Sequence, residues 1–125
     1  IVRGICCLIP GQTYSRNIRV TRIVDTFLEH ARIWYFGNGG NPKLFLGSPD
    51  WMRRNLYRRI EAVTPILDPD AKQELIDMLS IQLSDKRKAC FVDENLRNCW
   101  KSAHPQKEKV RSQYTFYEYL KEKTE

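Results

Sequence analysis

The sequence predicts one α/β domain, and three observations lead to this class. Short β-branched and aromatic runs alternate with longer segments whose apolar residues recur at helical spacing. An Asn-Gly-Gly turn joins two of the short runs, as in a hairpin. The length of 125 residues and the 42% hydrophobic fraction suit one modest domain with its own core, and are too small for two.

The first elements are predicted from residues 1–29. Residues 1–9 read as a buried strand bounded by Pro10-Gly11, and residues 11–16 as a polar loop. Since the chain opens inside this strand without an initiator methionine, we expect it to be a piece of a longer protein. Residues 17–29 are expected to form a helix, because their apolar residues follow helical spacing. These residues are Ile23, Val24, Phe27 and Leu28.

The middle of the chain predicts a hairpin and a further strand. Residues 33–36 form a β-prone run that ends at the turn, and residues 43–46 are its returning partner. Asp50 is placed to cap a short helical turn through Asn55. Residues 58–66 predict another strand.

The last third predicts two helices around a strand and a loop. Pro69 suits a first helical position after Asp68, so a helix is expected through about residue 84. Residues 86–92 predict a short strand. The charged residues 101–109 predict a loop, and residues 110–123 a final amphipathic helix.

The net charge of +6 lies entirely in the first half of the chain. Residues 1–62 hold ten Lys and Arg against four Asp and Glu, whereas residues 63–125 hold eleven of each. Lys43 is the only lysine among those ten cations. Arginine favours bidentate contacts with phosphate, so we expect a phosphate-rich anionic partner that meets the first half.

The four cysteines (Cys6, Cys7, Cys90 and Cys99) follow no metal-binding pattern. The adjacent pair would face opposite sides of the predicted strand. We therefore expect small packing residues in a reducing compartment, and a cytoplasmic location that leaves room for peripheral association with a membrane. No apolar run approaches the roughly 20 residues that span a bilayer.

His30 is the first candidate for chemistry, since it stands at the edge of a predicted strand. In extended chain Arg32 would share its face. An imidazole exchanges a proton near neutral pH, and a guanidinium holds anionic oxygens. A surface or capping role is the alternative for His30. His104 has no comparable neighbour and reads as a solvated loop residue.

Arginines supply the other candidates. Arg3 lies in an apolar segment, so its charge needs solvent, a carboxylate or a bound anion. On a strand Arg58 and Arg59 would face opposite sides, so only one of them would reach a site. Together with Arg53 and Arg54 they form a basic cluster, and the usual role of such a cluster is to form a solvent-exposed face. Trp34 and Trp51 are expected in the core. The sequence has no Walker motif, GxGxxG motif, metal cage or Ser-His-Asp arrangement.

Four segments of the chain closely resemble the long-chain polyphosphate kinase family, in the family's order. They are residues 1–11 (IVRGICCLIPG), 23–32 (IVDTFLEHAR), 50–55 (DWMRRN) and 110–113 (VRSQ). The resemblance implies that residues 1–125 are the C-terminal portion of the family's final catalytic domain. The implied fold is phospholipase-D-like, a mixed sheet flanked by helices, here as a partial domain.

The resemblance also implies an activity. The family reversibly transfers the terminal phosphoryl group of ATP to polyphosphate through a phosphohistidine, on a site shared by two such domains. The phosphorylated histidine, the Mg2+ ligands and the residue that stacks on adenine are expected outside residues 1–125. The implied substrates are ATP or ADP and polyphosphate. The implied partners are the rest of the kinase chain and further copies of it in a homo-oligomer. The segment alone is expected to be inactive.

By this resemblance Arg3 contacts nucleotide phosphates, His30 is a proton donor or charge stabiliser opposite the phosphohistidine, and Arg59 contacts phosphate. No metal ligand is assigned. Against the phospholipase D pattern His-x-Lys-x4-Asp, Arg32 replaces the lysine and Gly37 the aspartate. Two alternatives stay open. One is a polyanion or nucleic-acid binding module. The other is a phospholipase-D-type phosphodiesterase half-site.

Overall fold

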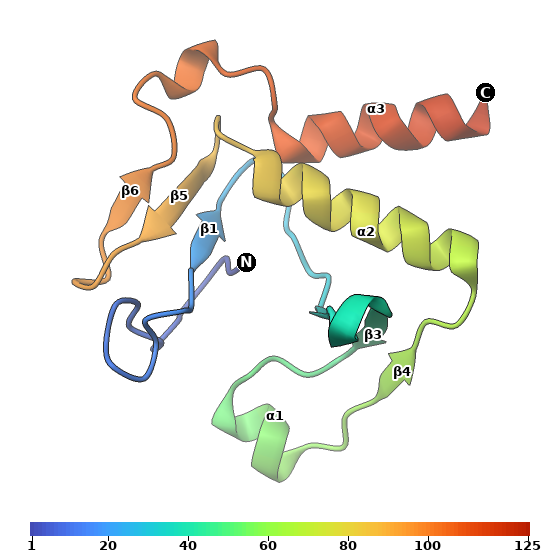
Figure 1. Cartoon of the computed structure of the whole chain (residues 1–125), viewed down its shortest axis with the longest axis horizontal. Coiled ribbons are helices and arrows are strands. Elements are labelled where there is room, and N and C mark those ends of the chain that lie inside the picture. The colour runs from blue at the N-terminus through green and yellow to red at the C-terminus, as the bar shows by residue number, and fades with distance from the viewer. The chain divides into compact units, whose positions relative to one another are not determined.

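The computed structural model describes all of residues 1–125 and confirms the α/β class (Figure 1). Its elements are β1 (Thr21–Ile23), β2 (Ile33–Phe36), β3 (Lys43–Gly47), α1 (Arg53–Arg58), β4 (Val63–Pro65), α2 (Pro69–Ser84), β5 (Ala89–Val92), β6 (Asn98–Trp100) and α3 (Ser112–Thr124), with short 3₁₀ turns at Asn38–Gly40 and Pro105–Lys107. No helix combines the length and the apolar character that crossing a bilayer requires.

The chain divides into two compact units, which we describe separately. Unit 1 comprises residues 1–28 and 77–125, and unit 2 comprises residues 29–76. Each unit contains a three-stranded sheet whose strands pair antiparallel. The strands expected in one mixed sheet are therefore divided between two small antiparallel sheets. The parallel pairing in the structure is a single bridge between Val2 and Arg22.

The sheet of unit 1 has the order β1-β5-β6. Thr21 pairs with Phe91 across β1 and β5, and Cys90 pairs with Trp100 across β5 and β6. The buried apolar side chains of this unit lie on β1, on β5 and just before β1. They are Val20, Ile23, Ala89, Cys90 and Val92.

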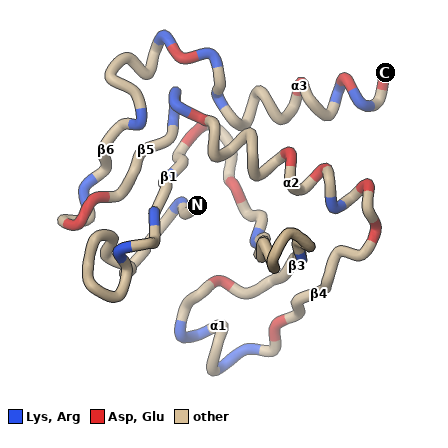
Figure 2. The backbone as a smooth tube through the Cα atoms, in the orientation of Figure 1, with Lys and Arg blue, Asp and Glu red and all other residues tan.

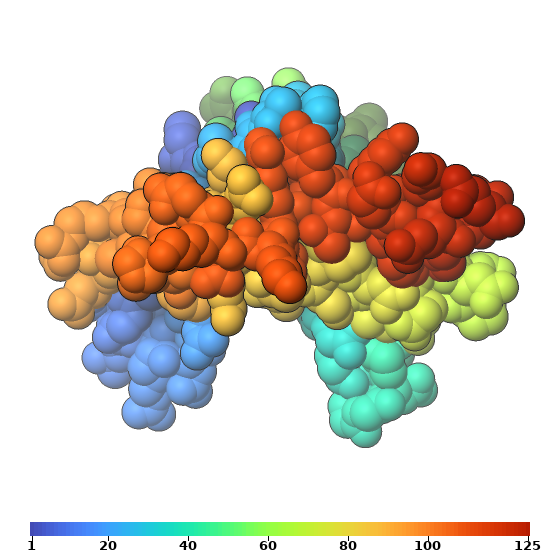
Figure 3. Space-filling model, turned by 90° about the horizontal axis from the view of Figure 1, so that it is seen from above, coloured from blue at the N-terminus to red at the C-terminus, as the bar shows by residue number.

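Side chains far apart in sequence tie the start of α3 to the rest of unit 1. Asp85 is fully buried, and its carboxylate accepts the backbone N–H of Arg87, Lys88 and Ser112, each at 2.8 Å. Arg111 donates to both carboxylate oxygens of Asp25 at 2.7 and 2.8 Å. Two of the four family-like segments thus bind each other. One side of α3 is visible in Figure 3, and Ser112 is its one buried residue.

The sheet of unit 2 has the order β2-β3-β4, and Leu44 of β3 is its buried centre. The β2-β3 hairpin turns through Asn38, Gly39 and Gly40, which all have positive φ and so suit these residue types. Gly47 lies so close to the Trp34 ring that an added Cβ would meet a ring carbon at 2.6 Å.

The hairpin and both long helices confirm their predictions. Asp68 accepts the backbone N–H of Ala71 at 2.8 Å, so it caps α2 directly before Pro69. α3 begins two residues later than expected and ends one later. The charged loop before it contains one short 3₁₀ turn.

Two predictions for the first 29 residues are wrong. In residues 1–9 only Val2 pairs with another strand, and Ile5 is 89% exposed, because no further strand lies alongside to satisfy the backbone. The helix expected at residues 17–29 is replaced by strand β1 within irregular chain. The β-branched residues around Thr21 fit a pleated strand, and pairing with β5 outweighs the helical spacing.

The middle of the chain also needs correction. α1 begins at Arg53 without a side-chain cap, since the Asp50 carboxylate binds Arg32 instead. The strand expected at residues 58–66 is limited to β4, and Arg58 ends α1. The strand expected at residues 86–92 begins only at Ala89, because residues 86–88 wrap around Asp85. Strand β6 was not predicted.

The cysteines only partly match their expected packing role. All four thiols are free. Cys90 is buried in β5, but Cys7 and Cys99 are exposed and Cys6 is intermediate. The opposite-face argument for the adjacent pair fails together with the strand at residues 1–9.

Candidate functional site

His30, Arg32 and Asp50 form a contact chain in unit 2. The Arg32 guanidinium lies 2.9 Å from His30 Nε2 and 3.3 Å from His30 Nδ1, and it also donates to the His30 carbonyl at 3.1 Å. A neutral imidazole can accept a hydrogen bond at only one of its two ring nitrogens, so the guanidinium cannot hydrogen-bond both. It therefore lies against the ring. The expected proximity of His30 and Arg32 is confirmed, although β2 begins only at Ile33.

Asp50 holds the other side of the Arg32 guanidinium. Its Oδ1 accepts Arg32 Nε at 2.9 Å, and the Arg32 side chain is only 20% exposed. The hydrogen bond from Arg32 lowers the pKa of Asp50, and the charges of Arg32 and Arg54 act in the same direction. In return, Asp50 raises the pKa of Arg32. The guanidinium against His30 is thus fixed in both position and charge.

Glu61 links this chain to Arg59. Ser48 donates to Glu61 Oε2, and Asn55 donates to Oε1 at 2.6 Å. These bonds lower the pKa of Glu61, led by that from Ser48, and the charges of Arg59 and Arg32 lower it further. Both carboxylate oxygens are therefore engaged by neutral donors.

Arg59 is exposed and follows the last residue of α1. The argument that Arg58 and Arg59 face opposite sides of a strand is wrong, because Arg58 is helical and Arg59 is its C-cap. Figure 2 shows the positions of the basic cluster along the backbone on and after α1, and the side chains of this cluster are exposed. Nothing in the structure selects Arg59 over its neighbours except its electrostatic effect on Glu61.

Arg3 lies in unit 1 and is partly buried. Its Nη1 is buried and has no hydrogen-bond partner. The next residue, Gly4, accepts a hydrogen bond from Arg22 Nη2 at 3.4 Å, while Arg22 Nη1 donates to Asn98 at 2.8 Å. No carboxylate lies within ion-pair distance of Arg3, so the alternative of a buried salt bridge is not realised. The guanidinium retains a donor for an anion.

The structure thus places the predicted residues in two groups. His30 and Arg59 belong to one electrostatic neighbourhood of unit 2 through Arg32 and Glu61, and Arg3 belongs to unit 1. A shared pocket for all three stays a prediction. No group of three or more His, Cys, Asp or Glu side chains is placed to hold a metal ion.

The remaining candidates differ in outcome. His104 is exposed in the loop before the 3₁₀ turn at residues 105–107, as expected. Trp34 packs against Gly47, whereas Trp51 is 79% exposed and does not belong to the core. The exposure of Trp51 follows from its place before α1, outside the strands of the sheet.

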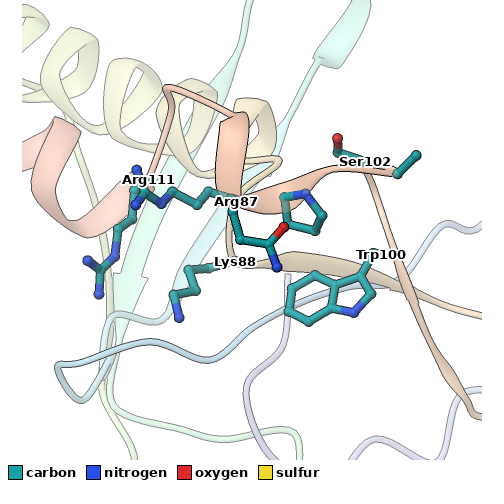
Figure 4. A pocket seen from close by; sticks show the side chains of 8 residues that line it. Arg87, Lys88, Trp100, Ser102 and Arg111 are labelled. Carbon is teal, nitrogen blue, oxygen red and sulfur yellow. The ribbon is translucent and has the colours of Figure 1, made fainter.

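Sequence reasoning missed Asp50 and Glu61 as partners of the candidate cations. It also missed a pocket in unit 1 that is lined in part by Arg87, Lys88 and Arg111 (Figure 4). The three consecutive cations at residues 86–88 were a usable signal for the pocket. They were overlooked because the charges of the second half cancel.

Comparisons with known proteins point to one family. Residues 1–113 match the family model described as polyphosphate kinase C-terminal domain 2. The chain is 46% identical over 122 residues to polyphosphate kinase of Escherichia coli K12, which covers 97% of this chain and 18% of that protein. It is 44% identical over 122 residues to the Vibrio vulnificus YJ016 polyphosphate kinase, with 97% and 17% covered.

A solved structure agrees with these matches. The crystal structure of polyphosphate kinase from Porphyromonas gingivalis superposes with a TM-score of 0.89 at 54% identity. The match covers 96% of this chain and 18% of that chain. The chain therefore spans less than a fifth of the length of these relatives.

Proposed function

Because this chain belongs to the polyphosphate kinase C-terminal domain family, we propose that it supplies one side of a site that transfers the terminal phosphoryl group of ATP to polyphosphate. The observation that carries the proposal is the family match over residues 1–113, which contain all three candidate residues. Phosphoryl transfer requires positioned positive charge around the phosphate oxygens more than covalent chemistry by the protein. The candidate residues are suited to this task.

Arg3 binds the nucleotide phosphates in this proposal. Its buried, unpartnered Nη1 supports the assignment, because such a donor is costly to leave unsatisfied. A phosphate oxygen would accept that N–H in a charge-assisted bond, which is stronger than a neutral one. Arg22 supports the adjacent Gly4 carbonyl, so the backbone next to Arg3 is held in place.

His30 acts on the transferring group as a proton donor or charge stabiliser. The exposed ring can reach a ligand, while Arg32, itself held by Asp50, contacts the ring from the protein side. A ring fixed in this way needs little reordering when substrate arrives. The phosphohistidine that would face it belongs to residues outside this chain.

Arg59 contacts phosphate from the end of α1. Glu61, the nearby carboxylate, is occupied by Ser48 and Asn55 and makes no ion pair with Arg59. The Arg59 guanidinium is therefore available to an anionic ligand. Its fork of N–H donors matches the oxygens of a phosphate group.

The proposal includes ATP or ADP and polyphosphate as substrates, the rest of a kinase chain and a homo-oligomer as partners, and a cytoplasmic location. When bound, Mg2+ would neutralise phosphate charge. The family resemblance, rather than the geometry of this chain, assigns the Mg2+ ligands to residues outside 1–125.

The test replaces Arg3 and His30 one at a time by alanine in a complete polyphosphate kinase that carries this segment. We expect each variant to lower the rate of polyphosphate synthesis by at least about tenfold, since each loses a group that stabilises transition-state charge. Arg16→Ala and His104→Ala are matched controls, because both side chains are exposed and neither makes a hydrogen bond or ion pair.

Circular dichroism checks that each variant folds. Near-normal synthesis by folded Arg3→Ala or His30→Ala enzyme would contradict the assigned roles. So would an equal loss in the matched controls, because it would show that any change of charge on this segment slows the enzyme.

A further inference from the structure

Unit 1 contains a pocket whose lining residues include none of the residues assigned above. Its volume is about 810 Å3, within the usual range for ligand sites. The lining includes three cations, one indole and two polar side chains, namely Arg87, Lys88, Arg111, Trp100, Ser102 and Gln106. Figure 4 shows the three cationic side chains on one side of the pocket and Trp100 on the other.

Two of the three cations are available to a ligand. Arg87 and Lys88 make no side-chain hydrogen bond or ion pair, whereas Arg111 is held by Asp25. No carboxylate lies within ion-pair distance of either cation, and Glu108 beside the pocket accepts a hydrogen bond from the lining hydroxyl of Ser102 at 2.6 Å. Asp25 is occupied by Arg111, and buried Asp85 accepts three backbone N–H groups.

The backbone that carries these cations is fixed before any ligand binds. Asp85 ties the amides of Arg87 and Lys88 to the amide of Ser112 at the start of α3. This one side chain sets the spacing between two chain segments that are 27 residues apart in sequence. On the other side, Trp100 is placed by its pairing with Cys90 across β5 and β6.

A rigid frame that holds unpaired cations opposite an exposed aromatic ring selects an anionic ligand. Guanidinium and ammonium groups together suit phosphate oxygens, and an indole that is 57% exposed offers a flat wall for the ligand. The volume is large enough for several linked phosphate groups.

We propose that this pocket binds a phosphate chain, with Arg87 and Lys88 contacting its oxygens. The choice of a chain with linked phosphates rests on the proposed function, while the cationic lining stands independently of it. Inorganic polyphosphate and the triphosphate of a nucleotide share this chemistry, so the test compares the two.

The experiment titrates the 125-residue chain with tripolyphosphate by calorimetry and by quenching of tryptophan fluorescence. We expect Arg87→Ala/Lys88→Ala to weaken binding at least about tenfold, since two charge-assisted contacts are lost. Arg16→Ala/Lys121→Ala removes the same charge from exposed positions outside the pocket, and its affinity should stay within about twofold of the parent. Trp100→Phe should remove most of the quenching while binding persists.

The ligand comparison repeats both titrations with ATP. Tighter binding of tripolyphosphate assigns the pocket to inorganic chains, and tighter binding of ATP assigns it to the nucleotide; either result supports a phosphate-chain site. Equal weakening in the two double variants would overturn the proposal, because it would show non-specific attraction. Equal displacement by a DNA duplex of the same phosphate concentration would overturn it too.

Arg87→Gln/Lys88→Gln is made as well, as a second variant that guards against unfolding of the loop after α2 in the alanine double. Both variants keep the backbone amides that Asp85 binds. Arg3→Ala separates this proposal from the proposed function. If Arg3→Ala abolishes tripolyphosphate binding and both pocket doubles leave it intact, the pocket proposal fails and the proposed function stands. If only the pocket double variants lose tripolyphosphate binding, while complete kinases with Arg3→Ala or His30→Ala stay active, the proposed function fails and the pocket proposal stands.

Discussion

Adding one methyl group at Gly47 should destabilise unit 2, and the structure shows where the clash arises. A Cβ there would lie 2.6 and 2.8 Å from two carbons of the Trp34 ring and 2.9 Å from the Ala62 carbonyl oxygen. Neither neighbour can easily withdraw. The Ala62 oxygen accepts the Ser48 N–H at 2.9 Å, and Trp34 is held in β2 by its pairing with Phe45.

The magnitude follows from two opposing effects. Overpacking a well-packed site costs about 1–3 kcal/mol. Replacing glycine by alanine also restricts the unfolded chain, which returns about 0.4–1 kcal/mol. The net loss is roughly 1–2 kcal/mol. For a chain of this size, this lowers Tm by roughly 4–8 °C.

Thermal unfolding followed by far-ultraviolet circular dichroism measures this loss. Gly37→Ala is the matched control, because a Cβ there meets nothing within 4 Å and its φ of −64° suits alanine. We expect the control to keep or slightly raise Tm. Equal Tm values for the two alanine variants would refute the packing argument. The Gly47 N–H also donates to the Arg32 carbonyl at 3.1 Å, so the strain should reach the backbone beside His30.

Two further predictions concern stability. The hydrogen bond from Arg111 lowers the pKa of Asp25 in the folded protein below its ordinary value of 3.8. The ion pair therefore stabilises the fold fully above about pH 4, and this stabilisation is lost as the pH falls through the lowered pKa of the folded state. Urea unfolding should therefore show Asp25→Asn to be less stable than the parent at pH 7, with a gap that narrows below about pH 4; a constant gap would contradict the assignment. Asp68→Ala should cost about 1 kcal/mol by removing the cap of α2, while Asp68→Asn should cost much less, as measured by the urea midpoint. Equal losses in the two Asp68 variants would rule out the capping role.

Elements that depend on local signals were predictable from the sequence. Asp68 and Pro69 mark the start of α2 within two residues, and the Asn-Gly-Gly turn specifies the hairpin by its need for positive φ. Residues 17–29 failed because their helical spacing competed with β-branched residues. Only the partner strand β5, more than 60 residues away, decides between the two conformations.

In the candidate site, too, contacts between residues near in sequence were predictable and contacts between distant residues were not. The proximity of His30 and Arg32 follows from a spacing of two residues and is confirmed. Asp50 was mistaken for a helix cap because its actual partner, Arg32, lies 18 residues earlier. The pocket of unit 1 combines residues 87–88, 100, 102–103, 105–106 and 111, which only the folded chain brings together. Whether Arg3 joins His30 and Arg59 stays a prediction.

Pro65 has a consequence for the outer edge of β4. Its neighbour Ile66 donates its N–H inward to Leu44 of β3 at 2.9 Å, so the nitrogen of Pro65 faces the other way, where its missing hydrogen disturbs no pairing. The same position lies on the unpaired side of a strand whose three residues are all exposed. A second molecule that tried to extend this sheet would meet a gap in the row of donors. Proline thus blunts an edge that would otherwise invite aggregation.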